Sequence, residues 1–184
     1  MSELLRYAKN NPDALNAASL GGFSDVISLM FKQAAGIEIQ IVPYRGGSEA
    51  MIGVIRGDAH LVFNPYSAMQ PQIQSGQLKA MAVTSLERSQ NLPNVPTFAE
   101  SGMAGFEIIN VVGILGPAGT PQAILTKLNA EISRIMSSSE GREFVLSRGN
   151  DIIDDFSPAY YASLLRDADN KYRAIIDRIG IKKH

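Results

Sequence analysis

The stretch that decides the fold is Ile37–Ser48, which reads IEIQIVPYRGGS. Apolar and polar residues alternate through its first half, a pattern typical of a strand with one buried face. A glycine-rich turn follows, and apolar residues then return at helical spacing, as Ala50, Met51, Val54 and Ile55. The stretch therefore predicts a strand that ends in a tight turn and opens a helix.

A turn of this kind has the chemistry of an anion-binding site. The first N–H groups of a helix have no partner within the helix and point toward one place. Arg45 adds a permanent positive charge and a planar fork of donors that suits a carboxylate or phosphate. The alternative is an ordinary strand-to-helix turn in which Ser48 is the N-cap.

A second turn, Gly21–Ser24, follows the apolar run Leu15–Ala18 and precedes another helical pattern. An ordinary turn with an N-cap is again the alternative, and Asp25 would favour the helix dipole but oppose a bound anion. Two such turns in one chain favour capture of a small anion over catalysis.

Strand and helix signals alternate through the first half of the chain. Helices are expected from Ser24, Ser48 and Tyr66, and strands at Leu15–Ala18, Ile37–Val42, Ala59–Phe63 and Leu78–Val83. Alternation of this kind predicts a parallel-rich sheet covered by helices. Ligands bind such sheets beyond the carboxyl ends of the strands, where both glycine turns would lie.

The second half of the chain carries different signals. Thr97–Glu100 fits a capping box for a short helix that Gly102 would end. The apolar run Phe106–Leu115 indicates a buried strand or a strand that crosses between two lobes. Thr120-Pro121 and Ser157-Pro158 each predict a helix start with proline at the first helical position. The last helix would end at Gly180, with an apolar face formed by Tyr161, Leu165, Ala168, Tyr172, Ile175 and Ile179.

Composition excludes several classes of function. The 184 residues include 17 basic and 18 acidic side chains, giving a net charge of −1 with no basic stretch, so we expect no nucleic-acid partner. There is no cysteine, and His60 and His184 lie far apart, so no metal site is expected. We expect the cluster Asp151, Asp154 and Asp155 to be a solvated turn before a helix cap. No nucleotide-binding or nucleophile motif occurs, so no catalytic residue and no cofactor are expected.

The start of the chain predicts a helix. Met1 leads directly into an amphipathic pattern with Leu4, Leu5 and Ala8 on one side. This pattern differs from the basic and then apolar leader of an export signal, so we read no signal peptide here.

Five stretches, in the same order, are typical of one family of transport proteins: Val42–Gly47, Gly57–Phe63, Ala82–Ser85, Leu92–Gly102 and Gly113–Pro121. On these residues the chain resembles the solute-binding proteins of tripartite tricarboxylate transporters, the Bug or TctC-like family. The resemblance spans Asn16 to Lys182. By the same comparison, the turn at Gly21–Phe23 is shorter than is usual, and Val26 stands where a histidine is common.

The resemblance implies a fold and a domain organisation. It implies an α/β lobe like that of type II periplasmic binding proteins, with a parallel-rich sheet flanked by helices, plus a helical C-terminal portion. Residues 1–108 would form the second-lobe ligand-binding domain. Residues 109–184 would form a crossover strand and the C-terminal helices that return to the first lobe in the family. The segment for the N-terminal lobe would be lacking.

The resemblance also implies a function. The protein would bind a small carboxylate without catalysis, in the periplasm, and its partners would be the membrane permease subunits of a tripartite transporter. We further expect the C-terminal helices to bury their apolar faces in a homodimer or against the sheet. The ligand-binding residues implied in this way are Ser19, Gly21, Gly22, Phe23, Ser24, Tyr44, Arg45, Gly46, Phe63 and Asn64.

Two other functions stay open on the sequence. One is a cytoplasmic effector-sensing domain, which would need a DNA-binding segment upstream. The other is a small α/β enzyme acting on a phosphorylated or carboxylated substrate, which would need a paired nucleophile and base. The residues supply no such pair, so the solute-binding hypothesis leads.

Overall fold

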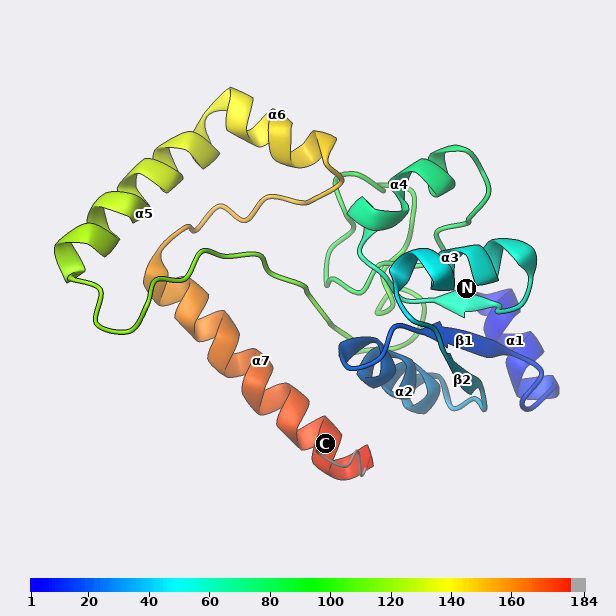
Figure 1. Cartoon of the computed structure of the whole chain (residues 1–184). Helices are drawn as coiled ribbons and strands as arrows, with labels where there is room; N and C mark the ends of the chain where they lie inside the picture. The colour runs from blue at the N-terminus through cyan, green and yellow to red at the C-terminus, as the bar shows by residue number, and fades with distance from the viewer. Residues whose placement is uncertain (180–184) are drawn as a thin grey trace. The chain divides into compact units, whose positions relative to one another are not determined.

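The computed structural model describes residues 1–179 of the chain. The chain consists of two compact units, Met1–Ile109 and Asn110–His184, and each is described by itself (Figure 1). The first unit is an α/β body, and the described part of the second is helical. The α/β fold with a parallel sheet and a helical C-terminal portion, expected from the sequence, is confirmed.

A three-stranded parallel sheet forms the centre of the first unit, with the strand order β2-β1-β3. Its strands are β1 (Asn16–Ser19), β2 (Gln40–Pro43) and β3 (Leu61–Val62). In the register of the central strand, Ala17 pairs with Ile41 on one side and Leu61 on the other. Strands β2 and β3 are shorter than the sequence pattern predicts.

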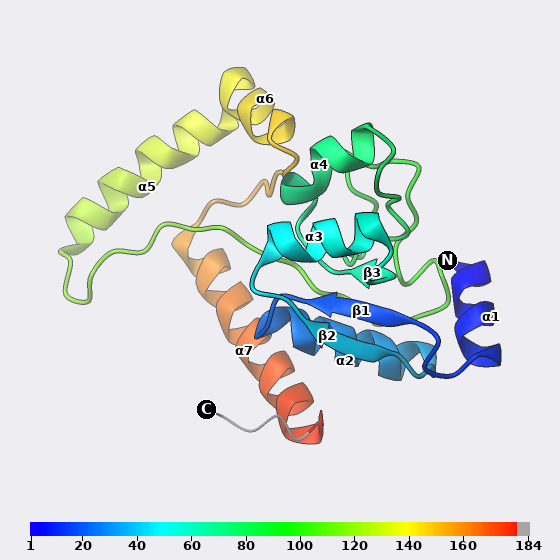
Figure 2. The same cartoon turned by 45° about the vertical axis from the view of Figure 1, so that its right-hand side comes forward.

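Helices cover both faces of this sheet. Helix α2 (Phe23–Ala35) lies on one side and α3 (Gly47–Arg56) on the other, as Figures 1 and 2 both show. The first connection runs from β1 to its neighbour β2, and the second returns from β2 past β1 to β3. Because parallel crossovers are right-handed, reversing the direction places α2 and α3 on opposite faces. Helices α1 (Ser2–Asn10) and α4 (Tyr66–Gln74) complete the helices of the unit. The helices expected at all four places are confirmed.

The core of the first unit has an aliphatic and an aromatic part. Because both faces of β1 are covered, Ala17 and Ala18 are fully buried. On the α3 side, Ala18 packs with Ala50 and Ala59. The aromatic part consists of four rings whose neighbouring centroids lie 4.5–6.2 Å apart: Phe31, Phe63, Phe98 and Phe106.

The strand expected at Leu78–Val83 does not form. Only Val83 has a strand-like partner, through an isolated parallel bridge to Thr97. An apolar pattern alone does not make a strand, because a strand also needs a neighbouring strand to accept its hydrogen bonds. That pairing depends on the tertiary fold and not on the local sequence. The prediction of a strand here was wrong.

The buried strand expected at Phe106–Leu115 is also absent. Phe106 and Ile108 are buried, and the Ile108 N–H donates to the Thr84 carbonyl over 2.9 Å. Farther along, the exposed fractions of Val112 and Leu115 rise to 87% and 73%. Among the described residues, no strand lies beside this end of the run. The run is therefore an extended segment that passes from one unit into the next.

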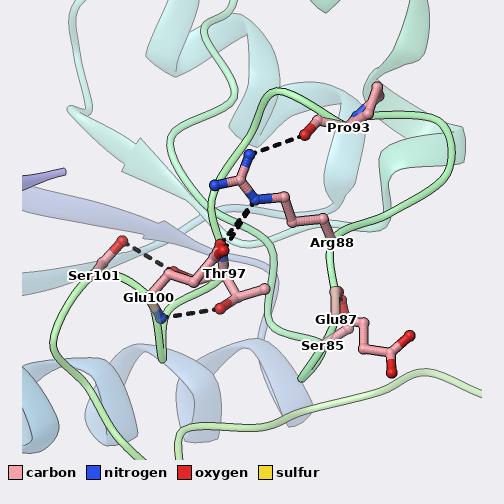
Figure 3. A network of polar contacts seen from close by, with 7 residues as sticks. All are labelled: Ser85, Glu87, Arg88, Pro93, Thr97, Glu100 and Ser101. Atoms are coloured by element: carbon pink, nitrogen blue, oxygen red, sulfur yellow. Dashed lines mark hydrogen bonds and ion pairs between the residues drawn. The ribbon is translucent and has the colours of Figure 1, made fainter.

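The capping box at Thr97 is confirmed (Figure 3). The Thr97 N–H donates to Glu100 Oε2 over 2.7 Å, and the Glu100 N–H donates to Thr97 Oγ1 over 3.0 Å. The short helix expected after it does not form, and residues 98–102 make hydrogen-bonded turns instead. Gly102 adopts φ +92° and the Met103 N–H donates to the Phe98 carbonyl, which ends the turn. Arg88 then binds the Glu100 carboxylate through Nε, which fixes the turn against the preceding loop.

The second unit contains α5 (Gln122–Ser137), α6 (Ser139–Ser147) and α7 (Pro158–Ile179). Ser157 caps α7 as predicted, since its Oγ accepts the Tyr160 N–H over 3.2 Å. Thr120 does not cap α5, because its hydroxyl donates to the Pro117 carbonyl over 2.8 Å instead.

Two further findings concern the helices as a group. Helix α6 was not foreseen as a separate element, and the helix end expected at Gly180 lies outside the described residues. Within residues 1–179, none of the helices combines the length and the apolar character that crossing a bilayer requires.

Candidate ligand-binding site

Three segments leave the sheet at its carboxyl edge, one after each strand. Because the strands are parallel, these segments meet at one edge. A Cβ placed on Gly47 would lie 3.2 Å from Asn64 Nδ2 and 3.8 Å from Leu20 Cδ2. The turns after β1, β2 and β3 therefore contact one another, and Asn64 lies beside the start of α3.

The turn after β1 depends on its glycines. Gly21 and Gly22 adopt φ values of +78° and +55°, which residues with a Cβ rarely reach. Gly22 is the N-cap of α2, so the helix begins before Ser24, the alternative cap residue. The first N–H groups of α2 thus follow directly from two exposed glycines, with no side chain on that stretch of backbone.

Buried hydroxyls and one carboxylate support this turn from below. The Gly21 N–H donates to Ser19 Oγ over 2.9 Å, and Ser19 Oγ in turn donates to Asp25 Oδ1. Ser19 is fully buried at the end of β1, whereas Asp25 is half-buried. Ser24 is also buried, and its Oγ has no hydrogen-bond partner within the described residues.

The turn after β2 has a different construction. Gly46 is the N-cap of α3, and its φ of 170° is extended backbone that other residues also adopt. The Arg45 N–H donates to Glu49 Oε2 over 2.9 Å, so an acidic side chain of α3 closes back over the turn. Ser48 lies inside the first helical turn and is not the cap. The Arg45 side chain is exposed.

The aromatic members of the expected set lie in different surroundings. Tyr44 packs against the alanine cluster of the α3 side, and a Cβ on Gly53 would lie 2.5 Å from its hydroxyl oxygen. Phe63 belongs to the aromatic part of the core, 5.5 Å from Phe31 between ring centroids. Phe23 is 43% exposed at the start of α2. Tyr44 and Phe63 therefore support the edge from the core, and Phe23 lies on the surface beside it.

Two carboxylates lie at this edge beside the expected residues. Asp25 and Glu49 each stand three residues after the cap of their helix. Asp25 accepts a hydrogen bond from Ser19 at the end of β1, and Glu49 accepts one from Arg45 in the turn after β2. Asp25 was noted on the sequence, but Glu49 was missed. An acidic residue three positions after Gly46 was the available signal, because that spacing allows a side chain to reach back over the cap.

Acidic groups elsewhere have structural partners. Asp154 pairs with Arg142 over 2.9 Å, and Asp155 accepts the Ser157 N–H over 2.8 Å. Hydrogen bonds from the Ser157 backbone and side chain lower the pKa of Asp155. Within residues 1–179, no group of three or more acidic, histidine or cysteine side chains could hold a metal ion. His60 lies at the other end of the sheet, where its Nδ1 is 2.7 Å from Asn16 Oδ1.

A separate cavity of about 570 Å³ lies at the amino edge of the sheet. Its lining includes Tyr7 of α1, Leu15 before β1, Lys79 and Pro96. The cavity is thus formed at the end of β1 opposite to the glycine turns. None of the expected ligand-binding residues lines it.

Comparison with known proteins defines the class to which this edge belongs. Residues 1–181 match the family described as "Tripartite tricarboxylate transporter family receptor". The chain belongs to this receptor family, as the sequence motifs predicted. It is 31% identical over 179 residues to the "UPF0065 protein in tcbD-tcbE intergenic region" of Pseudomonas sp. strain P51, covering 96% of this chain and 53% of that protein.

Solved structures of other proteins have the same fold. The chain is similar to "R. palustris Rpa4515 with adipate", with 27% identity, a TM-score of 0.86 and coverage of 98% of this chain and 61% of that one. It is also similar to "MatC (Rpa3494) from Rhodopseudomonas palustris with bound malate", with 26% identity, a TM-score of 0.76 and coverage of 96% and 61%. The chain spans about half the length of the curated relatives that it matches.

Proposed function

We propose that this chain binds a small carboxylate as a solute receptor of a tripartite tricarboxylate transporter. The observation that carries the proposal is the shared edge of three turns, which presents two helix N-termini beside each other in a member of the receptor family. Adipate in one structural neighbour and malate in another support a carboxylate as the ligand. A receptor family also supports binding without catalysis.

The backbone would do most of the binding. The N-termini of α2 and α3 would face the ligand, because the helix dipole favours negative charge there. At α2 the Ser24 N–H donates to the Gly21 carbonyl over 3.3 Å, so a ligand would share or replace this contact. The proposed ligand-binding residues of the first turn are Ser19, Gly21, Gly22, Phe23 and Ser24. Those of the neighbouring turns are Tyr44, Arg45, Gly46, Phe63 and Asn64, with the Arg45 guanidinium as an exposed positive charge at the rim.

Isothermal titration calorimetry with a panel of acids tests this proposal. The panel contains adipate, malate, succinate, citrate and aspartate, and a neutral diamide of succinate serves as the matched control ligand. We expect saturable binding of at least one acid and none of the diamide. Binding of no acid at millimolar concentration, by a protein whose thermal unfolding is cooperative, would contradict the proposal.

The division of the chain suggests separate roles for its two units. We propose that Met1–Ile109 is the ligand-binding lobe and that the helices from residue 110 onward serve assembly with a first lobe or with a second copy of the chain. Exposed apolar side chains on α5 support an assembly surface, since Ile124, Leu128 and Ile135 are each 50–52% exposed.

Light scattering coupled to size exclusion tests the assembly role. A homodimer that becomes monomeric in Leu128→Glu, but not in the polar-face control Lys127→Glu, would support pairing of copies through α5.

We also propose, from the family, that the protein is located in the periplasm and that its partners are the permease subunits. Fractionation of cells expressing the natural gene, followed by crosslinking to the membrane fraction, tests both.

A further inference from the structure

The turn after β1 contains a negative charge where a carboxylate ligand would bind. We propose that Asp25 makes this site selective for carboxylates that carry a hydrogen-bond donor, a hydroxyl or an ammonium group, next to the carboxyl group. This inference rests on the proposed function and names the ligand class of the same site. A fully ionised acid without such a donor would be the disfavoured ligand.

The hydrogen bonds of Asp25 leave it able to accept more. Ser19 Oγ donates to Oδ1, and an ionised carboxylate has room for about four hydrogen bonds in all. In the described part of the chain, Ser19 supplies the one hydrogen bond recorded for this side chain. Asp25 is only partly buried, and we infer that a donor on a ligand can reach the rest of its carboxylate. A donor on a ligand therefore has an acceptor waiting at the turn.

Charge makes this acceptor selective. The N–H groups at the start of α2 attract an anion, but Asp25 stands at the third position of the same helix and repels it. A ligand with carboxylates alone is attracted by the N–H groups and repelled by Asp25. A ligand that also brings a hydroxyl or ammonium group turns the repulsion into a charge-assisted hydrogen bond, which is stronger than a neutral one.

A second observation at this turn concerns a buried hydroxyl. Ser24 is 5% exposed, and its Oγ has no hydrogen-bond partner among the described residues. Buried hydroxyls are normally paired, and each exception calls for a partner that the chain itself does not provide. Ser24 is the neighbour of Asp25 and lies in the first turn of α2. The unpaired hydroxyl is enclosed in this structure, so a ligand carboxyl group that satisfied it would have to enter the turn beside Asp25.

Glu49 provides a matched control. It has the equivalent position in α3, but it is exposed and its carboxylate binds the backbone N–H of Arg45 rather than a buried hydroxyl. Glu49 follows the turn after β2, and among the described residues this turn has no buried hydroxyl that lacks a hydrogen-bond partner. Neutralising Glu49 removes one negative charge from the same edge of the sheet, so it separates a local effect of Asp25 from a general effect of charge.

The test compares three acids of the same length. Succinate, malate and aspartate differ only in the group at one carbon: hydrogen, hydroxyl or ammonium. We would measure their affinities calorimetrically for the wild type, Asp25→Asn and Glu49→Gln. The amide introduced by Asp25→Asn retains an oxygen that can accept from Ser19, so thermal unfolding should confirm an intact fold.

We expect the wild type to bind malate or aspartate about 10- to 100-fold more tightly than succinate, the range of a hydrogen bond to a charged group. In Asp25→Asn the preference should shrink to less than about threefold, chiefly because succinate binds better, by the same reasoning. In Glu49→Gln the preference should persist. Whether malate or aspartate leads identifies the donor as hydroxyl or ammonium.

The contrary outcomes are distinct. Equal binding of succinate, malate and aspartate by the wild type overturns this inference and leaves the proposed function standing. A preference that survives in Asp25→Asn also overturns it, since another residue would then read the donor. Binding of none of the three acids by any of the three proteins overturns the inference, and failure of the wider acid panel as well overturns the proposed function.

Discussion

The turn after β1 and the turn after β2 share a sequence pattern: two glycines, a helix start and an acidic residue three positions after the cap. The first turn needs its glycines, because Gly21 and Gly22 have positive φ values, and it stands on a buried serine. The second turn has an extended Gly46 and closes with an exposed glutamate. Similar sequences thus produce one turn that is tightly constrained and one that is not.

The acidic side chain three residues after the cap has a different partner in each turn. In the second turn, Glu49 satisfies a backbone N–H at the surface, as Glu100 does for Thr97 in the capping box. In the first turn, Asp25 binds a side chain, and the hydroxyl it binds is already an acceptor for the Gly21 N–H. A carboxylate that only caps a helix is structural. One that is linked to a buried hydroxyl in a glycine turn is the carboxylate that we propose takes part in recognition.

The largest expected effect comes from alanine at the two cap positions. Gly22→Ala should lower the free energy of unfolding by about 1–3 kcal/mol, because φ near +55° strains a residue with a Cβ. Gly46→Ala should change it by less than about 0.5 kcal/mol, since its backbone is extended and a Cβ there would meet no atom within 4 Å. Urea unfolding measures both. Equal losses in the two variants would remove the contrast between the turns.

A somewhat smaller effect is expected behind the second turn. Gly53→Ala would press a Cβ against Tyr44, at an overlap that costs about 1–3 kcal/mol, offset by about 1 kcal/mol of helix propensity. Unfolding free energies should therefore fall in the single variant. In a Tyr44→Ala background the same change should be neutral or stabilising. If Gly53→Ala is destabilising to the same extent in both backgrounds, Tyr44 does not fix this turn.

The smallest expected effect is a pH dependence of stability that comes from Glu100, the carboxylate of the capping box. Hydrogen bonds from Arg88 and from the Thr97 N–H hold the pKa of Glu100 below its ordinary value of 4.5. A lowered pKa in the folded state adds stability at higher pH, and this contribution is lost as the pH falls below about 4.5 through the lowered value. Unfolding midpoints measured from about pH 3 to pH 7 should fall less steeply in Glu100→Gln. An unchanged slope would mean that this carboxylate is not coupled to folding.

Local patterns predicted most of the first unit. Helix starts, glycine ends and the capping box at Thr97 depend on neighbours in sequence, so they could be read from a few residues each. The parallel sheet followed from the order of elements. The family motifs added the receptor class, which is confirmed by the match over residues 1–181.

Tertiary partners explain what the sequence missed. Leu78–Val83 and Phe106–Leu115 are as apolar as strands, but a strand exists only where another one accepts its hydrogen bonds. The caps at Gly22 and Gly46 precede the serines because the glycine backbone, not a hydroxyl, makes each turn. The hydrogen bond between Ser19 and Asp25 bridges a strand end and a helix, and no spacing rule identifies such a pair.

The aromatic part of the core also has a consequence for how the protein is made. Its four rings come from positions 31, 63, 98 and 106, so it joins the early part of the first unit to nearly its last residue. The sheet and its covering helices all precede Phe106 in the sequence, so they can form before this ring is in place. Until Phe106 has joined the other three rings, the aromatic part of the core is incomplete and exposes apolar surface.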